Sequence, residues 1–147
     1  MFIDQITNAG ALPSLRATMS FAGQRQKLIA HNIANAETPN FRPLDVSPAH
    51  FQTVLGEAID RRRGRSGGSF GALQLESSRE LRVGDRGELM IQPQTTSGNI
   101  LFHDRNDRDL ERMMQDLTEN YGVYRLASDL LRSHTLRLQS ALGERVG

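Results

Sequence analysis

The stretch Leu12–Ala36, LPSLRATMSFAGQRQKLIAHNIANA, decides the fold. Its apolar residues recur at alternating intervals of three and four, the heptad spacing of an α-helix that packs along one stripe. Pro13 is tolerated in the first helical turn, and Pro39 disfavours helical geometry just before it, so we expect the helix to end near Ala36 or Glu37. The predicted seam is apolar except at Gln26 and consists of Leu12, Leu15, Met19, Ala22, Gln26, Ile29, Ile33 and Ala36.

The C-terminal part of the chain repeats this spacing over a longer distance. Asn106 or Asp107 offers an N-cap, acidic residues crowd the first turns and arginines the later ones, which favours the helix dipole at both ends. The helix is expected to run to Leu142, about 50 Å at 1.5 Å per residue. The second predicted seam consists of Leu110, Met114, Leu117, Tyr121, Tyr124, Ser128, Leu131, Thr135, Leu138 and Leu142.

The two seams predict an all-α fold in which the N- and C-terminal helices pair as an antiparallel coiled coil. We expect residues 1–40 and 104–147 to form one helical domain, joined by a loosely ordered middle segment, 41–103. Within that segment, Leu81–Gln94 holds two short strand-like pieces around Asp85-Arg86-Gly87, which predicts a small hairpin. Ser66–Ser69 is typical of a flexible loop. A segment this weakly patterned is expected to be disordered or to be ordered by a partner.

Composition narrows the range of functions. The chain has 147 residues, 37% of them hydrophobic, a net charge of +1 and no cysteine, which excludes disulfides, thiolate zinc sites and cysteine nucleophiles. No apolar run approaches the roughly 20 residues that cross a bilayer. The start, Met1–Ile6, lacks the features of a cleaved Sec-type signal peptide, so we expect any export to use another route.

No motif predicts catalysis, a metal or a cofactor. His31, His50, His103 and His134 have no second ligand at helical spacing, and Asp104–Asp109 departs from a calcium loop at several ligand positions. Phosphate-binding glycine loops of the P-loop or dinucleotide type are absent from the sequence. The basic run Arg61–Arg65 reads as solvated linker charge, with nucleic-acid contact as the weaker alternative.

The most specific stretch is Ala30–Arg42, AHNIANAETPNFR. Its small alanines permit close helix approach, Asn32 and Asn35 lie on a common flank of the helix, and Thr38-Pro39 imposes an extended exit. The end of an ordinary coiled-coil helix would share these features. The stretch nevertheless resembles the Asn-Asn-Ile-Ala-Asn-Ala-x-Thr-Pro-Gly-Tyr motif of the bacterial flagellar axial proteins, the rod, hook and hook-associated subunits.

The match departs from that motif at His31, Asn40 and Phe41, and Asn40 preserves a residue that tolerates positive φ. Asn106–Met114 resembles the family's lead-in to its C-terminal helix. Within this family, three features are similar to the most proximal rod subunit. They are the short chain, the group Asn120, Tyr121 and Tyr124, and the segment Leu138–Gly143. The resemblance covers both terminal helices, about half of the chain.

The resemblance implies a structural subunit of the flagellar basal-body rod that assembles helically and transmits torque across the periplasm. It implies other rod subunits, a rod-to-membrane-ring adaptor and the membrane ring as partners, and export by the flagellar type III apparatus. We assign subunit packing to Leu15, Met19, Ala22, Gln26, Ile29, Asn32, Ile33, Asn35, Ala36, Thr38, Pro39, Leu110, Met114, Leu117, Tyr121, Tyr124, Leu131 and Leu138. The alternative function is a free-standing coiled-coil interaction or adaptor module, which would form a closed dimer.

Overall fold

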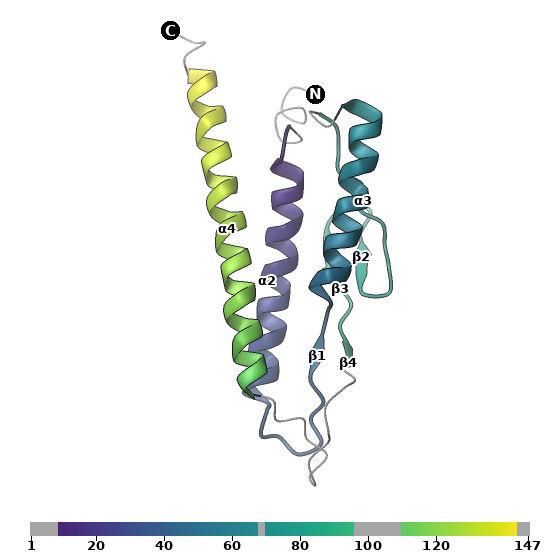
Figure 1. Cartoon of the computed structure of the whole chain (residues 1–147), viewed down its shortest axis with the longest axis vertical. Coiled ribbons are helices and arrows are strands. Elements are labelled where there is room, and N and C mark those ends of the chain that lie inside the picture. Colours follow the sequence, from purple (N-terminus) through teal and green to yellow (C-terminus); the bar gives the residue numbers. More distant parts are fainter. Residues whose placement is uncertain (1–8, 68–69, 96–109, 144–147) are drawn as a thin grey trace.

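Three helices and two very short sheets make up the described part of the chain. The computed structural model describes residues 9–67, 70–95 and 110–143. In chain order the elements are α2 (Leu12–Ala34), β1 (Leu44–Asp45), α3 (Pro48–Ser66), β2 (Leu81–Val83), β3 (Leu89–Ile91), β4 (Gln94–Thr95) and α4 (Leu110–Gly143). Figure 1 shows α2 in the middle, with α4 on one side and α3 with the strands on the other.

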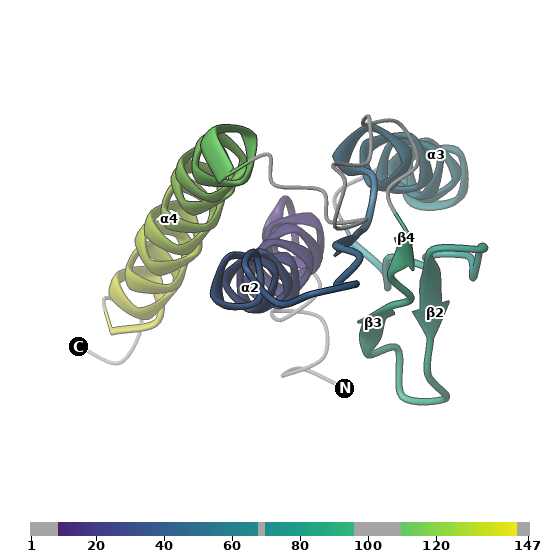
Figure 2. The ribbon, with the colours of Figure 1, turned by 90° about the horizontal axis from the view of Figure 1, so that it is seen from below.

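The two long helices expected from the heptad spacing are both present. Pro13 lies in the first turn of α2, which ends at Ala34, about half a turn before the expected end. α4 continues unbroken through Gly122 to Gly143, and its expected cap at Asn106 or Asp107 lies outside the described residues. The two helices lie side by side and run in opposite directions, as the colour gradient in Figure 1 and the view along the molecule in Figure 2 show.

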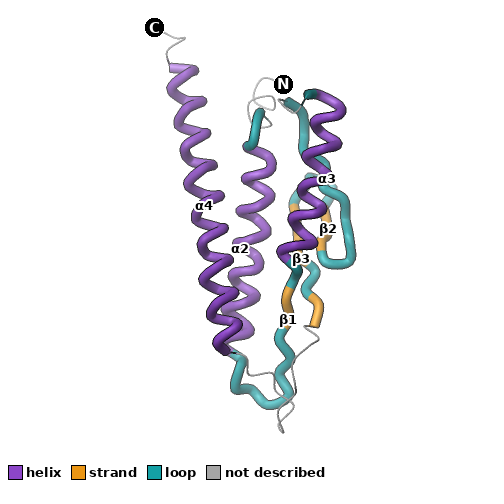
Figure 3. The backbone as a smooth tube through the Cα atoms, viewed as in Figure 1, coloured by secondary structure: helices purple, strands orange, loops and turns teal. Residues whose placement is uncertain are grey.

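The middle segment contains a helix that the sequence analysis does not predict. The Ser47 hydroxyl caps α3 by accepting a hydrogen bond from the His50 backbone N–H at 3.1 Å, and Pro48 occupies the first turn. Gly67, with φ of 65°, ends the helix in the left-handed conformation that glycine adopts without strain. The expectation of a loosely ordered segment is therefore wrong for 48–66. Figure 3 shows how much of the middle segment is helical.

The hydrophobic core lies between α2, α3 and the strands. Phe21 of α2 and Phe51 of α3 stack at its centre, with ring centroids 4.1 Å apart and planes 3° from parallel. Such a pair adds to the stabilisation that burial of the rings already provides. The buried cluster contains Ala17, Phe21, Val46, Phe51, Val54, Leu81 and Leu89.

The predicted hairpin is confirmed as β2 and β3, which pair antiparallel with Leu81 opposite Ile91. Gly87, with φ of 78°, supplies the left-handed residue that the tight turn needs. The outer edge of β3 is covered by the Gln24 side chain, whose Nε2 donates to the Leu89 carbonyl at 2.6 Å and whose Oε1 accepts from the Ile91 N–H at 3.1 Å. β1 and β4 form the second sheet.

Within residues 9–67, 70–95 and 110–143, every helix is too short or too polar to cross a lipid bilayer.

Candidate subunit interface

A buried amide fixes the pairing of α2 with α4. Asn120 of α4 is 5% exposed, and its Nδ2 donates to the Ala22 carbonyl at 2.8 Å and to Gln26 Oε1 at 2.7 Å. Gln26, the polar interruption of the predicted seam, therefore has its partner within the subunit. A single polar pair in an apolar seam favours one register, because a shifted register would leave both groups buried without partners.

The α2 side of the predicted seam agrees with the structure. Leu12, Ala22, Ile29 and Ala36 are buried, and the remaining four positions are half-buried. Gly23 lies against α4 closely enough that a Cβ there would come within 3.3 Å of the Tyr124 ring. The half-buried positions are Leu15, Met19, Gln26 and Ile33.

On α4 the buried positions repeat every seven residues, as predicted. At every second predicted position, however, the buried residue is the one before it in the sequence. The buried residues Met113, Asn120 and Ala127 are seven apart. Each precedes a predicted seam position, and one residue of an α-helix corresponds to a rotation of about 100°. The predicted positions Leu117, Leu131 and Leu138 are half-buried, whereas Leu110, Met114, Tyr121 and Tyr124 count among the exposed large side chains.

Arg25 joins three elements in a way that the sequence analysis missed. Its guanidinium donates to Asp45 of β1 with hydrogen bonds of 2.9 Å and 2.7 Å, and lies 3.6 Å from Asp116 of α4. Burial on its own would lower the pKa of Arg25, but the hydrogen bonds and charges of Asp45 and Asp116 raise it above its ordinary value. The residue is therefore a permanent cation between the core and α4.

Asn32, in the motif that carries the family resemblance, lies inside the subunit and not on an open flank. It is 4% exposed, its Nδ2 donates to the Leu44 carbonyl at 2.6 Å, and its Oδ1 accepts from the Leu44 N–H at 3.2 Å. The amide thus satisfies both backbone groups of one residue, as a neighbouring strand would. This clamp holds the returning chain against the end of α2.

The rest of the motif forms the exposed end of the helix. The Asn35 side chain donates to the His31 carbonyl at 2.8 Å and so satisfies one acceptor of the last turn. Thr38 and Pro39 are exposed in a turn closed by the Phe41 N–H on the Thr38 carbonyl at 3.1 Å. Asn40 has φ of 61°, as expected for a residue that replaces glycine there.

The basic run is not a linker, because it forms the last turns of α3. Arg62 is buried and donates to the Gly10 carbonyl at 2.7 Å. Arg61 lies 3.4 Å from Glu76, and Arg65 donates to Gln74 Oε1 at 2.6 Å. These arginines are engaged within the subunit.

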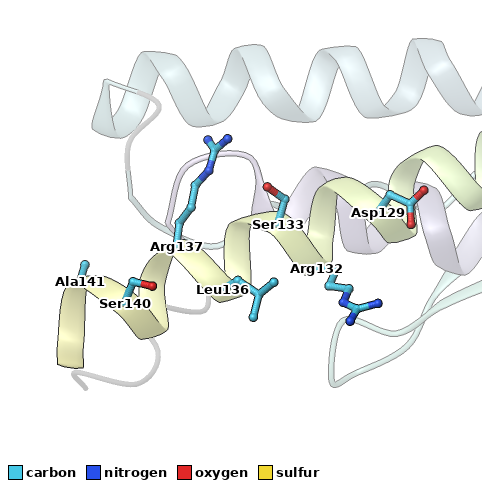
Figure 4. A pocket seen from close by; sticks show the side chains of 7 residues that line it. All are labelled: Asp129, Arg132, Ser133, Leu136, Arg137, Ser140 and Ala141. Carbon is cyan, nitrogen blue, oxygen red and sulfur yellow. The ribbon is translucent and has the colours of Figure 1, made fainter. Parts of the chain in front are cut away.

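Many large apolar side chains of α4 are exposed. Among the described residues, a hollow on α4 and a second one beside it bear on this surface. The first is a shallow depression lined by α4 alone (Figure 4), which makes it a helix surface and not a ligand cleft. The second, of about 350 Å³, lies between α2, α3 and α4. The exposed apolar side chains of α4 are Leu110, Met114, Tyr121, Val123, Tyr124, Leu126, Leu130 and Leu136.

Among the described residues no group of three histidine or acidic side chains is placed to hold a metal ion. His50 Nε2 lies 2.8 Å from Ser78 Oγ, and His31 packs edge-on against Phe41. His103 and the acidic run Asp104–Asp109 lie outside the described residues.

Comparison with known proteins identifies similar chains over most of this sequence. No model of a known protein family matches it. It is 26% identical over 140 residues to the flagellar basal body rod protein FlgB of Yersinia enterocolitica, and 27% identical over 140 residues to that of Yersinia ruckeri. Both alignments cover 90% of this chain and 93% of the relative.

A third relative is more similar over a shorter alignment. The flagellar basal body rod protein FlgB of Borrelia hermsii is 31% identical over 115 residues, which cover 75% of this chain and 78% of the relative. The three alignments cover between 78% and 93% of the relatives' length. The chain therefore belongs to the FlgB family of flagellar basal body rod proteins.

Proposed function

We propose that this protein is a structural, non-catalytic subunit of the proximal flagellar rod, which assembles helically with its neighbours and transmits torque. The observation that carries the proposal is the set of large apolar side chains that α4 leaves exposed on more than one flank. A soluble monomer rarely exposes so much apolar surface on one helix, whereas an assembled subunit buries it against neighbours.

We propose that α2 and α4 form an antiparallel coiled coil and that this helix pair carries the torque through the subunit. Support comes from their opposite directions, from the seven-residue spacing of Met113, Asn120 and Ala127, and from the Asn120–Gln26 pair. A helix pair fixed in register resists sliding, and a shaft that carries torque requires that resistance.

The predicted packing residues then divide into two groups with different roles. Leu15, Met19, Ala22, Gln26, Ile29, Asn32, Ile33, Ala36, Leu117, Leu131 and Leu138 are buried or half-buried and hold the subunit together. Leu110, Met114, Tyr121, Tyr124, Thr38 and Pro39 are exposed, and Asn35 is half-buried at the helix end; these seven are available to neighbouring subunits.

The resemblance to axial proteins supports a place for the subunit in the periplasmic rod of the basal body. Its partners there would be other rod subunits, the adaptor that joins rod to membrane ring, and the ring itself. Export through the flagellar type III apparatus would bring the chain there unfolded.

A tagged copy of the chain in a strain that lacks the native gene tests the proposal. We expect swimming to be restored and the tagged protein to copurify with basal bodies. Ile33→Asp places a charge in the half-buried seam and is expected to abolish swimming and incorporation, whereas Ala30→Asp, exposed on the same helix, retains both. Absence of the unmodified protein from basal bodies of a swimming strain would refute the function.

A further inference from the structure

α4 carries an apolar ridge on one flank and borders a concave groove on the other. The knob strip consists of Leu110, Met114 and Tyr121, which are 47%, 49% and 52% exposed. The three-helix groove is the hollow of about 350 Å³ between α2, α3 and α4. Its lining residues that matter here are Phe21, Phe51, Gln52, Leu55, Glu119 and Val123.

The groove is a formed depression and not an open helix face. The stacked pair Phe21 and Phe51 is buried at its base, while Leu55 of α3 and Val123 of α4 line it from two sides. Its polar lining includes Gln52 and Glu119, which offer hydrogen-bond partners to an entering side chain. An apolar depression with a few polar groups accepts a large amphipathic side chain such as tyrosine or methionine.

The knob strip and the groove cannot meet within one molecule. Successive residues on an α-helix are about 100° apart, so Tyr121 and Val123 point about 200° apart around α4. Asn120, bonded to α2, lies between these two directions. A contact between the knob strip and the three-helix groove must therefore join two molecules. Each molecule contributes a different surface to that contact.

Charge complementarity favours a second copy as the occupant. Arg125 lies one turn beyond Tyr121, its side chain is 69% exposed, and its pairing with Asp129 is loose at 3.9 Å. Glu119 is an exposed acid in the groove lining, whereas the cation that also lines the groove, Arg25, is buried and paired with Asp45. When the knob strip of one copy enters the three-helix groove of another, Arg125 beside the strip approaches Glu119 in the groove.

We propose that the knob strip of one copy of this chain inserts into the three-helix groove of the next copy. The inference rests on the proposed function and names the contact that builds the array. Because the two surfaces differ, the contact is heterologous, and repetition gives an open helical array instead of a closed two-fold dimer. Tyr121 is the central knob, since its ring fills apolar space and its hydroxyl can reach a polar group.

Disulfide mapping tests this contact directly, because the chain has no cysteine of its own. Two single variants, Tyr121→Cys and Gln52→Cys, both at exposed positions, are coexpressed in a strain lacking the native gene and oxidised in purified basal bodies. We expect the mixed disulfide to exceed either homodimer at least about fivefold, because docking raises the effective concentration of that pair alone. Thr118→Cys, exposed on the same helix, replaces Tyr121→Cys in the control and is expected to give no enrichment.

Each other outcome has a defined meaning. Equal amounts of the three disulfides, or dominance of a homodimer, would overturn the inference while the chain remains a rod subunit. A Tyr121→Cys disulfide to a different basal-body protein would exclude the second copy as occupant. If the chain is absent from basal bodies, the proposed function fails, and the same oxidation of the concentrated purified chain then decides the contact.

A charge variant gives an independent measurement. Tyr121→Glu retains the circular dichroism of the helices, because this side chain lies outside the seam, and is expected to abolish concentration-dependent self-association in sedimentation. Self-association equal to that of the unchanged protein would contradict the inserted knob.

Discussion

The two sides of α2 are packed in different ways. Toward α3 and the strands, the side chains of several elements meet in a contiguous core centred on Phe21 and Phe51. Toward α4, the partner helix buries Met113, Asn120 and Ala127 and leaves most of its other large apolar residues exposed. The α3 side has the contiguous core that is typical of an independently folding domain. The α4 side leaves apolar surface exposed, as is typical of a site of interaction with other molecules.

This difference separates stability from assembly. Substitutions on the α3 side are expected to change the free energy of unfolding, and substitutions on the outer flanks of α4 are expected to change association alone. Residues that touch both sides, such as Arg25, couple the two properties. The following variants are ordered from the largest expected loss of stability to the smallest.

Phe51→Ala removes a buried ring from the core between α2 and α3 and leaves a cavity against Phe21. We expect the free energy of unfolding to fall by about 3–5 kcal/mol. Urea denaturation followed by circular dichroism measures the loss. Tyr121→Ala is the matched aromatic control on the exposed flank, and we expect a change within about 0.5 kcal/mol. Similar losses for the two variants would remove the distinction between the sides.

Arg25→Met tests the residue that joins the sides and is expected to cost about 2–3 kcal/mol. The buried cation is bonded to Asp45, and its removal leaves that carboxylate without its partner; partial exposure of Asp45 keeps the loss below that of a fully buried pair. Arg125→Met, an arginine whose side chain is 69% exposed, serves as control and is expected to be nearly neutral. A neutral Arg25→Met would show that Asp45 needs no cationic partner, since the Val46 N–H still donates to it at 2.8 Å.

Asn120→Leu affects the α4 side and is expected to cost about 1 kcal/mol, because Gln26 Oε1 loses its donor. The double variant Asn120→Leu with Gln26→Leu is expected to recover this loss, since both polar partners are then gone. Amide hydrogen exchange of α4 separates local loosening from global unfolding. Additive losses in the double variant would contradict a direct coupling of the two amides.

Helix periodicity was predictable because it is local, but the phase of α4 was not. Pairs such as Met113 with Met114 offer an apolar side chain at either of two phases, and Asn120 looks unsuited to a seam until its partner Gln26 is known. The choice between phases depends on the facing helix. Sequence spacing alone therefore predicts the correct seven-residue repeat of α4 but places part of its contact face about 100° away from the observed one.

The core side depends on contacts between distant residues and was largely missed. α3 carries readable signals, the Ser47-Pro48 start and the spacing of Phe51, Val54 and Ala58, yet its arginine-rich end suggested a linker. The Asn32 clamp on Leu44 and the Arg25 bond to Asp45 join positions 12 and 20 residues apart. No local pattern identifies such partners.

The amide of Gln24 along the outer edge of β3 also protects the molecule from aggregation. A bare strand edge can pair with any other extended chain, including copies of the same chain that have not yet folded. By occupying the Leu89 carbonyl and the Ile91 N–H, one side chain closes that route on β3. In the proposed assembly, contacts between subunits would then fall to helical surfaces, whose shape and charge can discriminate between correct and incorrect neighbours.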